Sequence, residues 1–178
     1  QGDVVHVKGK NGSGKTTLLR MLIGALHPSE GNIEYNHIDI NRTRFEYLSN
    51  LVYVGHKVAL KSSLTALENL AWISGRDKKC ESLTKALEDM GLSEKKNVLC
   101  SELSVGQQRK LTLARILVSD AKIWLLDEPF NTLDSDGFTL LRDLIEAHKN
   151  NQGLVVYASH QNVSISDVKT IQLEKAIP

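Results

Sequence analysis

A glycine-rich segment early in the chain limits its possible folds most strongly. Residues 9–16 read Gly-Lys-Asn-Gly-Ser-Gly-Lys-Thr and fit the pattern G-x-x-x-x-G-K-[ST], whose glycines let backbone amides converge on phosphate oxygens. Such a loop needs a strand before it and a helix after it, because the helix N-terminus attracts the same anion. We expect Lys15 to bridge the β- and γ-phosphates of ATP and the Thr16 hydroxyl to bind Mg²⁺. The predicted phosphate contacts are Gly9, Lys10, Asn11, Gly12, Ser13, Gly14, Lys15, Thr16 and Thr17.

A second element is an apolar strand that ends in two acids. Residues 123–128 read Ile-Trp-Leu-Leu-Asp-Glu. Many strands end in an acid, so this pattern is weak alone, but the glycine-rich loop gives it meaning. The carboxyl ends of parallel strands are where α/β proteins bind ligands. We therefore expect Asp127 to hold Mg²⁺ through water and Glu128 to polarise the water that attacks ATP.

Strand-length apolar stretches alternate with helical patterns along the chain. This rhythm favours an α/β fold, with a mostly parallel central sheet flanked by helices. The expected strands are residues 3–8, 31–35, 51–54, 123–126, 154–158 and 169–173. The expected helices outside the middle of the chain are residues 15–23 and 137–148.

The middle of the chain is helical. Thr65-x-x-Glu68 is a capping box that opens a helix running to about Ser74. A second helical pattern ends at Gly91, and a third runs from Ser104 to about residue 118. We therefore expect a helical subdomain over residues 57–119, inserted into a single domain that spans residues 1–178.

Composition narrows the possible functions. The net charge of +1 provides no strong basic field, so we expect no direct nucleic-acid partner. No stretch approaches the roughly 20 apolar residues that cross a bilayer, so any action at a membrane requires a partner. The two cysteines follow neither a zinc nor a CxxC spacing, and we assign them no role.

Three further segments resemble motifs of a known protein family. Leu103-Ser104-Val105-Gly106-Gln107 resembles the ABC signature LSGGQ, with Val105 in place of the first glycine. The segment from Asn131 to Asp134 resembles the D-loop, and His160 resembles the switch histidine. With the glycine-rich loop and the two acids, these segments stand in the order typical of ABC ATP-binding cassettes, and the resemblance covers essentially the whole chain.

The resemblance implies a P-loop NTPase fold and a shared active site. In this family two cassettes pair head to tail, and each ATP lies between the phosphate loop of one and the signature of the other. It implies that Ser104, Gly106, Gln107 and Asp134 contribute to nucleotide binding. It also implies that Lys15, Glu128 and His160 are the catalytic residues, with ATP and Mg²⁺ as the ligands. The family pattern places further strands and an adenine-stacking aromatic residue before the first strand, so we expect these to precede residue 1.

His56 departs from the usual family pattern. Most relatives have a glutamine at this position, which contacts Mg²⁺ and the attacking water. Neutral imidazole is a poorer ligand for Mg²⁺ than an amide oxygen. We therefore expect His56 to act through a water or as a donor to the γ-phosphate, and the alternative is that it merely occupies a loop.

Several segments together resemble one subfamily, the cytochrome c maturation ATP-binding subunits of haem-exporter-type complexes. These segments are Tyr53–His56, Leu64–Leu70, Gln107–Gln108, Trp124–Phe130 and Ser159–Gln161. The subfamily implies integral membrane permease subunits as partners, a second, identical cassette, and a peripheral position on the cytoplasmic face of the inner membrane. An alternative is a soluble ABC ATPase that acts on nucleic acid or ribosomes. A P-loop kinase is a third possibility, but the signature and D-loop have no role in such an enzyme.

Overall fold

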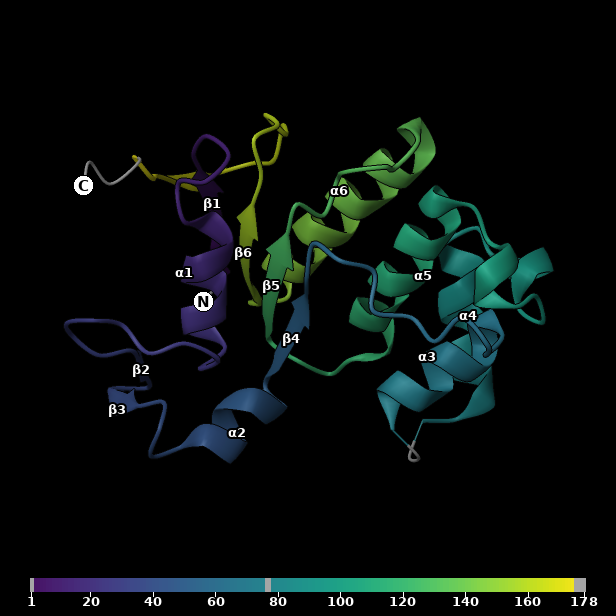
Figure 1. The fold of residues 1–178 in the computed structure, drawn as a ribbon, viewed down its shortest axis with the longest axis horizontal. Helices are drawn as coiled ribbons and strands as arrows, with labels where there is room; N and C mark the ends of the chain where they lie inside the picture. The colour runs from purple at the N-terminus through teal and green to yellow at the C-terminus, as the bar shows by residue number, and fades with distance from the viewer. Residues whose placement is uncertain (1, 76–77, 175–178) are drawn as a thin grey trace.

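The computed structural model describes residues 2–75 and 78–174. Its main sheet has five parallel strands in the order β4-β5-β6-β1-β7 (Figure 1). Their bounds are β1 Val4–Lys8, β4 Leu51–Val54, β5 Ile123–Asp127, β6 Leu154–Ala158 and β7 Val168–Gln172. The parallel arrangement brings the carboxyl ends of all five strands to one edge of the sheet. The α/β fold expected from the strand and helix rhythm is confirmed.

In the described part of the chain, six α-helices accompany the sheet. Their bounds are α1 Lys15–Leu22, α2 Arg44–Ser49, α3 Ala66–Ser74, α4 Cys80–Asp89, α5 Val105–Val118 and α6 Ser135–Asn150. Two short 3₁₀ turns lie at Ser93–Lys95 and Cys100–Glu102. α3, α4 and α5 pack together as a lobe beside the sheet (Figure 1). These three helices lie in the part of the chain for which a helical subdomain is expected.

The sheet is covered on both faces, and the side-chain alternation along β5 shows how. Trp124 and Leu126 face the core shared with α3, α4, α5 and α6, whereas Ile123 and Leu125 face the core shared with α1. Every residue of β5 is buried. A strand buried on both faces explains the continuous apolar run in the sequence.

One local expectation was wrong, and one short helix was not predicted. The strand expected at residues 31–35 shrinks to β2 Glu34–Tyr35, which pairs antiparallel with β3 Ile38–Asp39 in a separate hairpin. Asn36 and His37, at φ 52° and 64°, form the tight turn between them. The helix α2 was not expected, because its six residues are too few to show a clear period.

The capping box expected at Thr65 is present, and a second one opens α5. Thr65 Oγ1 accepts from the amide of Glu68 at 3.2 Å, and the Glu68 carboxylate accepts from the Thr65 amide at 2.8 Å. Ser104 and Gln107 make the same reciprocal pair at the start of α5. In residues 2–75 and 78–174, no helix has the length and apolarity that a membrane crossing requires.

Candidate functional site

The glycine-rich loop joins β1 to α1 and wraps around the Lys15 ammonium. Gly12 and Gly14 adopt φ of 82° and 95°, which L side chains rarely adopt. Lys15 is only 7% exposed and donates to the carbonyls of Gly9 at 2.7 Å and Lys10 at 3.3 Å. The ammonium is therefore held in place by the loop backbone before any anion binds.

Thr16 and Asp127 meet where α1 and β5 face each other. The Thr16 hydroxyl donates to Asp127 Oδ2 at 2.9 Å. Asp127 is 1% exposed, and its Oδ1 has no hydrogen-bond partner within the described part of the chain. A buried carboxylate oxygen without a partner is costly unless a ligand satisfies it. A hydroxyl and a carboxylate are oxygen donors of the kind Mg²⁺ prefers, so these residues fit that ion.

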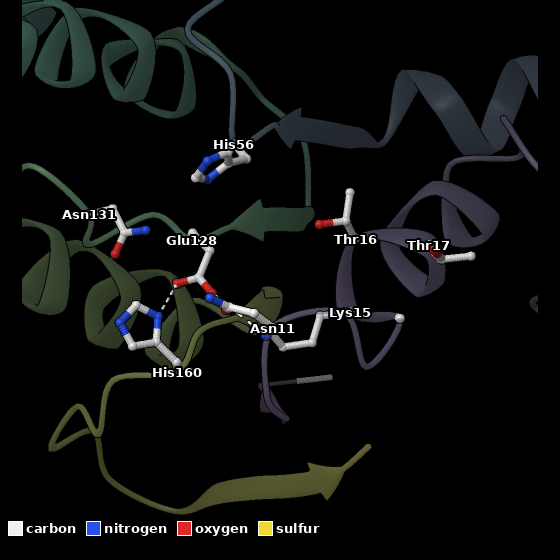
Figure 2. Close-up of a pocket in the computed structure, with 10 residues that line it drawn as sticks. Asn11, Lys15, Thr16, Thr17, His56, Glu128, Asn131 and His160 are labelled. Carbon is white, nitrogen blue, oxygen red and sulfur yellow. Dashed lines mark hydrogen bonds and ion pairs between the residues drawn. The ribbon is translucent and has the colours of Figure 1, made fainter. Parts of the chain in front are cut away.

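Glu128 lies at the centre of the site. Glu128 Oε1 lies 3.8 Å from Lys15 Nζ, and Glu128 Oε2 lies 3.1 Å from His160 Nδ1 (Figure 2). The side chain is 10% exposed, and the Glu128 amide donates to the Ala158 carbonyl of the neighbouring strand at 2.8 Å. Its backbone has a φ of 46°, an uncommon value for a residue with a Cβ. This geometry holds a carboxylate between two nitrogen groups at the mouth of the loop.

These groups line one cavity of about 450 Å³. The lining residues are Asn11, Gly12, Gly14, Lys15, Thr16, Thr17, His56, Glu128, Asn131 and His160. The structure thus brings most of the expected phosphate, Mg²⁺ and catalytic residues together, and it places His56 beside them. Asn131 lines the cavity although it was expected only as part of the D-loop segment.

Three expected loop residues do not line the cavity. Gly9 and Lys10 supply the carbonyls that hold Lys15. The Ser13 hydroxyl is buried without a hydrogen-bond partner in the described residues. A Cβ on Gly9 would collide with this hydroxyl and would lie 2.8 Å from the Leu173 carbonyl, so a glycine is required there.

The signature residues lie elsewhere. Ser104, Gly106, Gln107 and Asp134 line a separate cavity of about 340 Å³ at the N-terminal end of α5. A single copy of the chain therefore does not bring these residues to the phosphate loop. A Cβ on Gly106 would approach the Thr132 carbonyl to 3.1 Å, which explains a glycine at this position from contacts within the chain.

The valine in the signature is compatible with the local backbone. Val105 is the first residue of α5, has no positive φ, and is 63% exposed. A glycine is therefore not needed at this position. Asp134 accepts from the Gly137 amide at 2.8 Å as the N-cap of α6. The Lys110 ammonium, 2.9 Å away, is the main cause that lowers the pKa of the Asp134 carboxyl.

Comparison with known proteins decides the family. Residues 1–131 match a family model described as ABC transporter. The chain belongs to the ABC transporter family. The cassette is 38% identical over 177 residues to the cytochrome c biogenesis ATP-binding export protein CcmA of Histophilus somni, covering 98% of the chain and 82% of that protein. It is 42% identical over 172 residues to the CcmA of Nitrosococcus oceani, covering 97% and 80%.

A solved structure agrees with this family. A putative ABC transporter ATP-binding protein from Pyrococcus furiosus superposes with a TM-score of 0.84 at 28% identity, covering 97% of this cassette and 84% of that chain. The expected P-loop NTPase fold and the resemblance to the cytochrome c maturation ATP-binding subunits are both confirmed. The cassette is an ATP-binding ABC-type ATPase.

The sequence patterns did not identify one buried arginine that lies behind the site. Arg109 on α5 is 3% exposed, and its guanidinium reaches the backbone below Glu128. A signal was present, because Arg109 is spaced three, four and seven positions before three buried residues of α5. These are Thr112, Leu113 and Ile116. A charged residue on a buried helix face requires buried hydrogen-bond partners.

Proposed function

We propose that this cassette is the ATP-hydrolysing subunit of a membrane transporter complex for cytochrome c biogenesis, in which two copies clamp ATP between them. The observation that carries the ATPase assignment is the cluster of Lys15, Thr16, Glu128 and His160 around one cavity. Asp127 lies behind Thr16 and accepts its hydroxyl hydrogen bond. The biogenesis assignment is supported by the relatives, whose names describe ATP-binding export proteins.

Each catalytic group has a proposed step. Water attacks the γ-phosphorus, the bond from that phosphorus to the β,γ-bridging oxygen breaks, and ADP and phosphate form. Glu128 accepts the proton of the attacking water, since its carboxylate is held at the cavity. Lys15 neutralises charge on the β- and γ-phosphates, and His160 donates to the γ-phosphate or holds Glu128 in place. Mg²⁺ held by Thr16 and Asp127 would neutralise phosphate charge when bound.

His56 supplements this set. Its position on the cavity wall supports the role of a donor to the γ-phosphate, or of a group that acts through a bridging water. A His56→Ala variant is then expected to lose ATP turnover while its fold is kept, because the residue is exposed. Unchanged turnover in this variant would contradict the proposal.

The clamp requires a second copy. Ser104, Gly106 and Gln107 would present the N-terminus of α5 to the γ-phosphate bound on the partner cassette. The separation of the signature cavity from the phosphate cavity on one chain supports this arrangement. Hydrolysis removes the phosphate that both copies contact, so the clamp opens after turnover.

A sharp test of the clamp uses a hydrolysis-deficient protein. Glu128→Gln is expected to run as a monomer without nucleotide and as a dimer with MgATP in size-exclusion chromatography with light scattering. The matched control adds Val105→Glu, an exposed change that leaves the fold intact but would place a negative charge against the partner's phosphate. A Glu128→Gln protein that stays monomeric at saturating MgATP, or a double variant that still dimerises, would refute the clamp.

Membrane permease subunits are the proposed partners, and the helical lobe is the proposed surface for them. Trp72 on α3 is 61% exposed, with the Lys61 ammonium 3.8 Å from its ring centroid. A large exposed aromatic residue is typical of a protein-binding surface. The cassette would thereby lie on the cytoplasmic face of the inner membrane. Co-purification with cytochrome c maturation permeases would support this assignment, whereas recovery with ribosomes or nucleic acid would reject it.

A further inference from the structure

The buried guanidinium of Arg109 joins two separate segments of the backbone. Its Nη1 donates to the Gly55 carbonyl at 2.9 Å. Its Nη2 donates to the carbonyls of Asp127 at 3.0 Å and Glu128 at 2.8 Å, and its Nε donates to the Pro129 carbonyl at 3.4 Å. One side chain on α5 therefore holds the end of β5 and the end of β4 at the same time.

All four acceptors are backbone carbonyls. Within the described residues, the structure shows no carboxylate in an ion pair with Arg109, although the side chain is almost fully buried. Burial lowers the pKa of Arg109, and the charges of Asp127 and Glu128 oppose this effect. The planar fork of arginine presents several donors in fixed directions, which the single ammonium of a lysine cannot reproduce.

The acceptors are the residues that aim the catalytic side chains. The Glu128 carbonyl belongs to the residue with φ 46°, a left-handed conformation that costs roughly 1 kcal/mol without support. Gly55 precedes His56, which lines the cavity. The hydrogen bonds from Arg109 therefore act on the backbone directly behind both side chains.

We propose that Arg109 is a positioning residue for ATP hydrolysis, which fixes the backbone behind Glu128 and His56 and couples it to the helix that Ser104 caps. The inference rests on the catalytic role proposed above for Glu128. Arg109 follows Ser104 by five residues, which is about 7.5 Å along a helix. A rigid segment of about one and a half turns thus connects the signature of this copy to its own hydrolytic carboxylate.

The test replaces Arg109 conservatively and compares it with a matched arginine. Arg109→Lys keeps the charge but loses the fork, so the backbone behind Glu128 can shift. Misplacement of a catalytic group by about 1 Å can cost about 10²-fold in rate. We therefore expect kcat to fall between about 10-fold and about 100-fold, while KM and the dissociation constant for ATP stay within about twofold.

Arg115→Lys is the control. Arg115 lies on the same helix and burial lowers its pKa as well, but its Nε has no hydrogen-bond partner in the described part of the chain. We expect this variant to keep kcat within about twofold of the unaltered protein. Rates are expressed per mole of bound fluorescent ATP analogue, so that only folded protein is counted.

The outcomes separate positioning from mere stability. A loss of kcat at unchanged nucleotide stoichiometry and affinity supports the proposal. A kcat within twofold of the unaltered protein, or a kcat that falls only in step with nucleotide stoichiometry, overturns it. If Arg109→Lys and Arg109→Gln both bind no nucleotide while Arg115→Lys does, Arg109 serves the fold and the proposal is also rejected. Failure of the unaltered protein to hydrolyse ATP would instead reject the proposed function.

Discussion

The Glu128 carboxylate should speed ATP hydrolysis and weaken ATP binding, and one substitution measures both effects. Glu128→Gln keeps the size and backbone of the residue, and its amide can still bond His160. It removes the proposed proton acceptor, and general bases contribute about 10²- to 10⁴-fold to rates. We expect kcat to fall by that factor, because no other carboxylate among the described residues lines the cavity.

The same substitution should tighten ATP binding. Glu128 lies 3.8 Å from the Lys15 ammonium that would bind the phosphates. An anion bonded to this ammonium would lie on the order of 5 Å from the carboxylate, where two unit charges repel by about 3 kcal/mol at an effective dielectric constant of about 20. Bound Mg²⁺ and solvent would screen roughly half of this repulsion. The remaining ~1.4 kcal/mol corresponds to about tenfold tighter binding.

Two assays measure these effects. Release of inorganic phosphate under saturating MgATP gives kcat, and titration with a fluorescent ATP analogue gives the dissociation constant. Glu128→Ala serves as the control, because it removes the charge and also the hydrogen bond to His160. A kcat within tenfold of the unaltered protein, or ATP binding that weakens in the glutamine variant, would contradict this role of the Glu128 charge.

Three further predictions concern stability and Mg²⁺. Burial lowers the pKa of His6 and His148 from the ordinary 6.5, so both histidines favour the neutral form in the folded protein. As the pH is lowered below about 6.5, the free energy of unfolding measured in urea should therefore decrease. The decrease should be at most about 1.4 kcal/mol per pH unit for each histidine. Ser104→Ala removes the N-cap of α5 and should lower the free energy of unfolding, measured by thermal unfolding, by about 1 kcal/mol. At temperatures where the variant stays folded, its ATP turnover should fall at least about tenfold. Thr16→Val removes the hydroxyl bonded to Asp127 and should raise the Mg²⁺ concentration for half-maximal activity about tenfold, while EDTA should stop hydrolysis by the unaltered protein.

The strands and helices of the site were predictable wherever the signal is local. β4, α3 and β6 have the bounds expected from the sequence, because apolar runs and capping residues mark their ends. The hairpin of β2 and β3 and the short helix α2 were not predictable. Two-residue strands and a six-residue helix are too short for periodicity to distinguish them from loops.

Part of the chemistry of the site could be predicted from the sequence. The phosphate loop depends on eight consecutive residues, and the capping box at Ser104 depends on four, so both are encoded where they act. Val105 looked like a departure from the signature, and the structure explains it, since the position is helical and exposed. The unpaired Oδ1 of Asp127 could not be anticipated, because burial and partners depend on packing around the strand end.

Local sequence thus specified the proposed catalytic groups, their order along the chain and the family to which the chain belongs. The tertiary structure alone decides which of these groups come into contact, because the contacts join residues that are far apart in the sequence. Thr16 bonds Asp127 across 111 residues, Glu128 meets His160 across 32, and Arg109 reaches Gly55 across 54. Such pairs arise from the order of parallel strands and from helices packed against them, which no short segment encodes. The same packing holds the signature away from the phosphate loop, so that a single copy presents two separate cavities.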